Sequence, residues 1–217
     1  MNSRTALLAG ATGLIGSQLL PLLLASEHYS TVTVIGRRPV NLTHSKLNNQ
    51  VVDFDKLASY TAVLKADDIF CCLGTTMKQA GSREAFRKVD YEYPLALARF
   101  AHEQGARQYS LVSAMGADRN SRIFYNRTKA EVEDDISAIP YKSIHIYRPS
   151  LLRGPRASFR LGETVGNVVM TAFAFLTPKQ YRPIKSIKVA RAMVSYASRE
   201  EDGIYFHPSD SLQAFKA

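Results

Sequence analysis

The stretch LLAGATGLIGSQLL, residues 7–20, decides the fold, because three glycines in it join an apolar run to a helical pattern. Glycines at such a junction allow a tight turn, let backbone amides approach a pyrophosphate, and permit close packing of helix against strand. Their spacing, Gly-x-x-Gly-x-x-Gly, differs from the commoner Gly-x-Gly-x-x-Gly fingerprint, and a glycine pattern alone is weak evidence. We predict a nucleotide-binding loop; a turn in which the glycines only solve a packing problem is the alternative. The residues expected at the phosphates are Gly10, Thr12, Gly13, Leu14, Ile15 and Gly16.

Short apolar runs alternate with longer helical segments along most of the chain. Runs such as TVTVIG (31–36), DDIFCCLG (67–74) and RQYSLVSA (107–114) have the length and composition of buried strands. Strands separated by helices imply right-handed βαβ crossovers and a parallel sheet covered on both faces. The pattern predicts an α/β doubly wound parallel sheet, the Rossmann fold, with about six strands by residue 148.

Residues 150–217 are too few for a large second domain. Helical patterns near 163–176 and 186–199 and a short strand at GIYFHP, residues 203–208, are expected there. We predict one domain over residues 1–217, in which residues 150–217 fold onto the sheet edge as a small substrate-side extension.

Composition places the chain among globular proteins, with 46% apolar and 22% charged residues. Its longest nearly uncharged stretch, Thr164 to Pro178, falls short of the roughly 20 apolar residues needed to cross a bilayer, so we expect a packed helix there. The first residues, MNSRTALLAG, lack a long apolar segment and a cleavage site. We expect a cytoplasmic protein that does not enter a membrane.

Neither the cysteines nor the histidines suggest a metal site. The only cysteines are the adjacent Cys71 and Cys72, in an apolar run typical of a buried strand. His102, His145 and His207 have no partners at metal-ligand spacing, and we predict no metal. The net charge of +9 comes from scattered residues, which favours a phosphate-bearing ligand over nucleic acid.

The end of the second predicted strand indicates which dinucleotide the loop would take. Arg37 and Arg38 stand where an NAD-specific fold carries an acid for the ribose 2′-hydroxyl. An acid would repel a 2′-phosphate, whereas arginine binds it through charge-assisted hydrogen bonds. NADP(H) is therefore favoured over NAD, and a solvated surface pair is the alternative.

Two further segments fit the same ligand. After the third strand, Asp53 could accept a hydrogen bond from the adenine amino group and Phe54 could line its pocket; a helix N-cap at Asp53 or Asp55 is compatible with both roles. After the fourth strand, the predicted contacts lie at the sheet edge where open α/β sheets bind ligands, and a simple turn at the glycine is the alternative. They are Cys72, Leu73, Gly74 and Thr75.

Three residues form a candidate catalytic set. Ser113 ends the fifth strand, and Tyr125 and Lys129 lie one helical turn apart on the next helix. A neighbouring ammonium stabilises tyrosinate and lowers the phenol pKa from about 10, which would make Tyr125 a usable acid or base. Ser113 would hydrogen-bond the substrate oxygen, and Lys129 could also hold the nicotinamide ribose.

The motifs GATGLIG, GRR, CCLGTT, YNRTK and YRPSLLRGP, in this order, resemble the short-chain dehydrogenase/reductase superfamily over nearly the whole chain. The run CCLGTTMKQAGSREAFRKVDYEYPLALA is similar to an atypical NAD(P)H-binding group that includes a human Tat-interacting NADPH-binding protein and bacterial uncharacterised oxidoreductases. The resemblance implies that Tyr125 transfers the proton, that Lys129 binds the ribose and tunes the tyrosine, and that Ser113 orients the substrate.

Two positions depart from the superfamily pattern. Asp90 stands nearest to the asparagine that many relatives carry after the fourth strand, which leaves no asparagine for a proton relay. Leu151 replaces the usual asparagine beyond the sixth strand, and Pro149, Ser150 and Leu151 are expected to border the nicotinamide. Sugar-nucleotide epimerases share the motifs but resemble chains with a longer C-terminal part.

These expectations combine into an NADP(H)-dependent oxidoreductase that moves a hydride between nicotinamide and the carbonyl or alcohol carbon of an unidentified small molecule. The alternative is an NADPH-binding sensor or regulatory protein with little turnover. The long helices after strands four and five are candidate faces of a homodimer.

Overall fold

The computed structural model describes residues 3–154 and 181–215. Seven strands form one sheet in the order β3-β2-β1-β4-β5-β6-β9, and every neighbouring pair is parallel. The strands are β1 (Arg4–Ala9), β2 (Tyr29–Gly36), β3 (Leu47–Val51), β4 (Asp68–Cys71), β5 (Gln108–Val112), β6 (Ser143–Arg148) and β9 (Gly203–Pro208). A separate two-stranded sheet joins β7 (Leu152–Arg153) to β8 (Ile184–Lys185).

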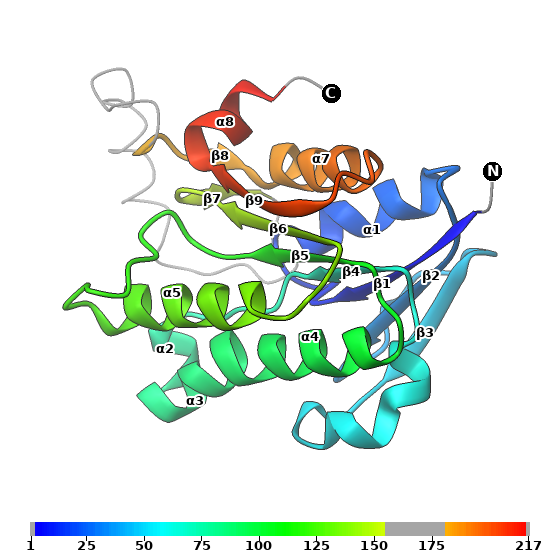
Figure 1. The fold of residues 1–217 in the computed structure, drawn as a ribbon, viewed down its shortest axis with the longest axis horizontal. Coiled ribbons are helices and arrows are strands. Elements are labelled where there is room, and N and C mark those ends of the chain that lie inside the picture. The colour runs from blue at the N-terminus through cyan, green and yellow to red at the C-terminus, as the bar shows by residue number, and fades with distance from the viewer. Residues whose placement is uncertain (1–2, 155–180, 216–217) are drawn as a thin grey trace.

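Helices cover both faces of the large sheet, so the molecule has three layers (Figure 1). One face carries α1 (Gly16–Ala25), α7 (Ser186–Ala197) and α8 (Ser209–Ala214). The other carries the 3-10 segment η1 (Phe54–Leu64), α2 (Met77–Ala80), α3 (Arg83–Arg87), the π-helical turn η2 (Lys88–Glu92), α4 (Tyr93–Glu103) and α5 (Phe124–Ser137).

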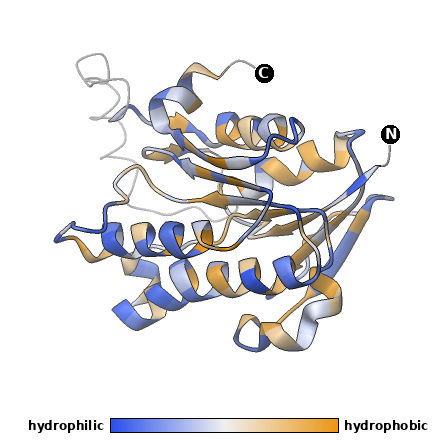
Figure 2. Cartoon of the chain, viewed as in Figure 1, coloured by the Kyte–Doolittle hydropathy of each residue, from blue (hydrophilic) through white to orange (hydrophobic). Residues whose placement is uncertain are grey.

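Each layer buries its own apolar cluster against the sheet. Leu19 and Leu23 of α1 pack with Val189 and Met193 of α7 on one face. On the opposite face, the cluster includes Leu97 of α4 and residues of η1 and α5. Apolar colour therefore concentrates on the strands and on the inward sides of the helices (Figure 2). This two-sided burial is what a parallel sheet requires.

The predicted doubly wound α/β fold is confirmed. All six strands expected by residue 148 form, and the predicted strand at 203–208 is β9, which pairs with β6 at the sheet edge. The helix expected near 186–199 is α7. The helical patterns at 163–176 and at 164–178 lie outside the described residues. Among those that are described, no helix combines the length and apolarity of a membrane span.

Two segments differ from the expected regular helices. The helix expected after β3 is the 3-10 segment η1, whose backbone leaves helical geometry at Lys56 and Tyr60. The helical stretch from Arg83 to Glu103 is interrupted by the π-helical turn η2. A π turn accommodates one extra residue, so the side chains after it point in new directions; such turns are frequent at functional sites. Hydropathy patterns do not detect either feature.

Candidate functional site

The glycine loop is shaped first by the protein's own packing. Gly10 has φ of 85°, and a Cβ on it would lie 2.5 Å from the carbonyl oxygen of Cys72 at the end of β4. A Cβ on Gly16 would lie 2.2 Å from the carbonyl oxygen of Gly10. The packing role that was the alternative for these glycines is therefore real, and it brings the ends of β1 and β4 together.

The same loop also leaves donors for an anion. The backbone N–H groups of Leu14 and Ile15 have no acceptor among the described residues, while Thr12 and Gly13 are exposed. These groups lie at the N-terminus of α1, whose first turn holds no acid. The free N–H groups and the dipole of such a terminus favour a phosphate. The loop therefore fits the pyrophosphate of a dinucleotide.

Arg37 and Arg38 follow β2 and are both exposed. Neither has an ion-pair partner in the described part of the chain. The end of β2, just before these arginines, is held in place, because the N–H of Val52 after β3 donates to the carbonyl of Gly36 at 3.0 Å. The guanidinium groups of Arg37 and Arg38, which follow this fixed strand end, could therefore bind a phosphate group.

Asp53 and Phe54 have structural roles. The Asp53 carboxylate accepts the N–H of Asp55 at 3.0 Å and caps η1, as the N-cap alternative predicted. Phe54 is buried and packs on the ring of Tyr93 with centroids 5.3 Å apart. Asp53 itself is exposed.

Ser113 lies just beyond the end of β5, buried, with its N–H bonded to the carbonyl of Tyr147 at 2.8 Å. Its Oγ has no hydrogen-bond partner among the described residues. A buried hydroxyl without a partner is costly, and native proteins satisfy nearly all of them. An oxygen atom of a bound ligand could supply the missing hydrogen-bond partner of this hydroxyl.

Tyr125 and Lys129 lie one turn apart on α5, as predicted. The Tyr125 ring packs against Phe86, with centroids 5.4 Å apart. Burial raises the pKa of the Tyr125 phenol; Lys129 lowers it, but Asp90 raises it again, and the net direction is upward. The expectation of a lowered phenol pKa is therefore wrong for this state of the protein, because it left out burial and Asp90.

Asp90 is the residue that the sequence interpretation undervalued. Its Oδ1 lies 2.7 Å from Lys129 Nζ, and its Oδ2 accepts the N–H of Thr75 at 2.8 Å. Burial alone would lower the pKa of Lys129, but Asp90, then Tyr125, outweigh it and raise that pKa, so the ammonium stays charged. The available signal was the position of Asp90, which stands nearest to the asparagine that many relatives carry after the fourth strand.

The family model described as NAD(P)H-binding matches residues 10–142, more than half of the chain, including the glycine loop and Tyr125 with Lys129. The chain belongs to the NAD(P)H-binding family. It is 35% identical to "Protein HTATIP2" of Rattus norvegicus over 167 residues, 75% of this chain and 69% of that protein. It is 34% identical to "Protein FMP52, mitochondrial" of Debaryomyces hansenii over 205 residues, 89% of this chain and 88% of that protein.

Solved structures share the fold of this NAD(P)H-binding protein at low sequence identity. "MoeE5 in complex with UDP-glucose and NAD" has a TM-score of 0.71 at 16% identity, covering 93% of this chain and 74% of that one. The Bordetella bronchiseptica enzyme WbmH in complex with NAD⁺ has a TM-score of 0.73 at 14% identity, covering 96% and 76%. Together with the relatives above, the family match confirms the resemblance to an NAD(P)H-binding group, and these solved structures show the same fold.

In this NAD(P)H-binding protein the segment after β6 is fixed at the same edge of the sheet. The carbonyl of Pro149 accepts the N–H of Met115 at 3.1 Å, and the Ser150 hydroxyl donates to the carbonyl of Arg182 at 2.5 Å. The Leu151 side chain is half exposed. The structure brings these residues to the edge that carries Ser113, but shows no convergent polar set among them.

The β4 segment is also placed as expected. Cys71 is buried and Cys72 partly buried, and both thiols are free. Leu73 packs against the core, and Gly74 lies over the Asp90–Lys129 pair. Across residues 3–154 and 181–215 no group of three or more potential ligands could hold a metal ion.

Proposed function

We propose that this protein is an NADPH-dependent reductase of carbonyl compounds. One observation carries the proposal: the unpartnered Oγ of buried Ser113 lies at the same sheet edge as the free N–H groups at the start of α1. Tyr125 and Lys129 come to this edge on the helix that follows Ser113. Open α/β sheets bind ligands at this edge, where the strand order reverses.

The order of the strands arranges the proposed contacts along one line. Arg37 follows β2, the glycine loop follows β1, Gly74 follows β4 and Ser113 follows β5, and these four strands are neighbours in the sheet. Three strand intervals of about 4.8 Å separate β2 from β5, or about 14 Å. An extended dinucleotide could therefore place its 2′-phosphate at Arg37 and its nicotinamide near Ser113.

When bound, NADPH would supply a hydride with its electron pair to the carbonyl carbon while the oxygen takes a proton from Tyr125 Oη, giving an alcohol and NADP⁺. Ser113 would donate a hydrogen bond to that oxygen and stabilise its developing charge. Lys129, held charged by Asp90, would hold the ribose hydroxyls. Tyr125, with its raised pKa, is protonated at neutral pH and so can serve as the acid.

The preference for NADPH is tested by thermal shift with NADP⁺, NADPH, NAD⁺ and NADH. We expect the phosphorylated forms to stabilise the protein more, and Arg37→Ala and Arg38→Ala to remove the difference without affecting the NADH shift. Arg99→Ala, which removes an exposed arginine from α4, is the matched control. Equal shifts with all four nucleotides would overturn the arginine argument.

The role of Tyr125 is tested on a panel of carbonyl compounds with NADPH. Tyr125→Phe should lower kcat by about 10²-fold or more, since positioned acid–base groups contribute about 10² to 10⁴. Tyr60→Phe, on η1, should not change it. NADPH binding without turnover of any panel member would favour the sensor or regulatory alternative.

Three further properties complete the proposal: one domain over residues 1–217, a cytoplasmic location, and a homodimer formed through α4 and α5. The fungal relatives carry "mitochondrial" in their names, so subcellular fractionation with tagged protein is the direct test of location. Light scattering would decide the oligomeric state.

A further inference from the structure

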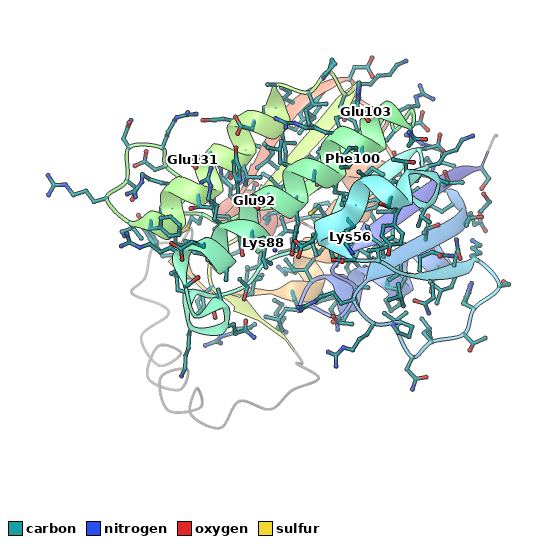
Figure 3. All side chains as sticks on the ribbon, turned by 90° about the horizontal axis from the view of Figure 1, so that it is seen from below. Lys56, Lys88, Glu92, Phe100, Glu103 and Glu131 are labelled. Carbon is teal, nitrogen blue, oxygen red and sulfur yellow. The ribbon has the colours of Figure 1, made fainter. Side chains whose placement is uncertain are left out.

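The π-helical turn η2 interrupts an otherwise continuous helix from Arg83 to Glu103, and Asp90 lies at its centre. The other acid of this turn, Glu92, is exposed on the outer face of the layer (Figure 3). Asp90 instead points inward and is 1% exposed. The interruption of the helix thus accompanies a carboxylate placed in the interior beside the proposed catalytic residues.

The inward carboxylate is held from two sides. Oδ1 lies 2.7 Å from Lys129 Nζ on α5, and Oδ2 accepts the N–H of Thr75 at 2.8 Å. Gly74 covers the pair, since a Cβ on it would be 3.4 Å from Oδ1 and 3.9 Å from Nζ. The Lys129 side chain is only 5% exposed. Its charge is therefore balanced by a neighbouring carboxylate, with little access to solvent.

Few charged groups face Tyr125. In the described part of the chain, the ones that act on its phenol are Lys129 from α5 and Asp90 from η2. Phe86 from α3 contributes an apolar ring. The nearby Cys71 thiol of β4 stays neutral, because burial raises its pKa. The effect of Lys129 on Tyr125 thus depends on whether Asp90 is charged.

We propose that Asp90 is the counter-ion that offsets the charge of Lys129, acts together with burial to keep Tyr125 a protonated phenol, and so favours carbonyl reduction at neutral pH. The catalytic role of Asp90 rests on the proposed function, but its effect on the pKa of Tyr125 can be measured without turnover. Asp90 acts through Lys129 and Tyr125 and is a positioning residue. Without its charge, Lys129 would favour tyrosinate, the form that accepts a proton during alcohol oxidation.

The test measures the Tyr125 phenol directly, by NMR of protein labelled with ¹³Cζ-tyrosine. The Tyr125 signal is assigned by its loss in Tyr125→Phe. Asp90→Asn keeps an oxygen for the Thr75 N–H and removes the charge, so the pKa of Tyr125 should fall by about one unit or more. Glu92→Gln removes a carboxylate from the exposed side of the same turn and should leave that pKa unchanged.

A second variant covers the case in which Asp90→Asn does not fold. Asp90→Asn/Lys129→Gln leaves no unpaired buried charge, and its Tyr125 pKa should lie within about half a unit of the wild-type value. A clear rise in the double variant would mean that Lys129 was not cancelled and would overturn the proposal. So would a Tyr125 pKa in Asp90→Asn equal to that of the wild type.

If a substrate is reduced, the pH profile gives an independent measurement. The fall of kcat at high pH should begin about one unit lower in Asp90→Asn than in the wild type or Glu92→Gln. A shifted Tyr125 pKa without any Tyr125-dependent turnover would refute the proposed function and leave the counter-ion assignment standing. Tyr125-dependent turnover, with the same pH profile and the same Tyr125 pKa in Asp90→Asn as in the wild type, would support the proposed function and refute the counter-ion assignment.

Discussion

The pair formed by Arg148 and Glu133 gives the sharpest prediction about how α5, the helix of the proposed catalytic residues, is held against the sheet. Glu133 lies on α5, one turn beyond Lys129, and its side chain is 1% exposed. Arg148 at the end of β6 donates Nε to both carboxylate oxygens, at 3.1 and 3.0 Å, and its terminal nitrogen also bonds Oε2. Arg148→Met would leave this carboxylate buried and unpaired.

The expected loss of stability follows from the burial of Glu133 and from the partial exposure of Arg148. Removing one partner of a buried pair costs about 3–5 kcal/mol. Arg148 is 32% exposed, so solvent can partly replace it. We expect Arg148→Met to lower the free energy of unfolding by about 2–3 kcal/mol at pH 7.

Urea denaturation at pH 7 measures this loss. Arg148→Met/Glu133→Gln should be more stable than Arg148→Met, because the uncharged amide of glutamine needs no counter-ion. The control is Arg119→Met, which breaks the pair with Asp134 on the same helix, where the side chains are 65% and 53% exposed. It should cost less than about 1 kcal/mol. Equal losses in Arg148→Met and Arg119→Met would refute the reasoning.

Two further predictions concern the glycine loop and the β6–β9 edge. Gly10→Ala should lower the free energy of unfolding, measured in urea, by about 2 kcal/mol or more. Gly10 has φ of 85°, and a Cβ on it would lie 2.5 Å from the carbonyl oxygen of Cys72. Gly13→Ala is the control and should cost less, because the nearest contact of its Cβ would be at 3.3 Å. Burial lowers the pKa of both His145 and His207 to about 4, so the unfolded chain binds protons first as the pH falls below about 6.5. Stability should therefore decrease by about 5 kcal/mol between pH 6.5 and 4, with about half of the loss from each histidine. A flat stability profile over this range would contradict the histidine prediction.

Much of the fold and part of the site could be predicted from local patterns. The strand–glycine–helix junction at residues 7–20 and the alternation of strands and helices predicted the parallel sheet, because burial on both faces demands continuous apolar strands. The spacing of Tyr125 and Lys129 and the strand-end position of Ser113 followed from helical and strand periodicity. These features depend on residues close together in sequence, which is why the sequence determined them.

Tertiary structure decided the electrostatics of the site. Asp90 and Lys129 are far apart in sequence, and only the packing of η2 against α5 brings their charged atoms within 2.7 Å. The same packing buries Tyr125 and reverses the direction in which its pKa was expected to move. Glu133 reads as one of several acids on a polar helix, yet the approach of β6 buries it against Arg148. A charge acts according to its distance from other charges and from solvent, and the fold alone determines both distances.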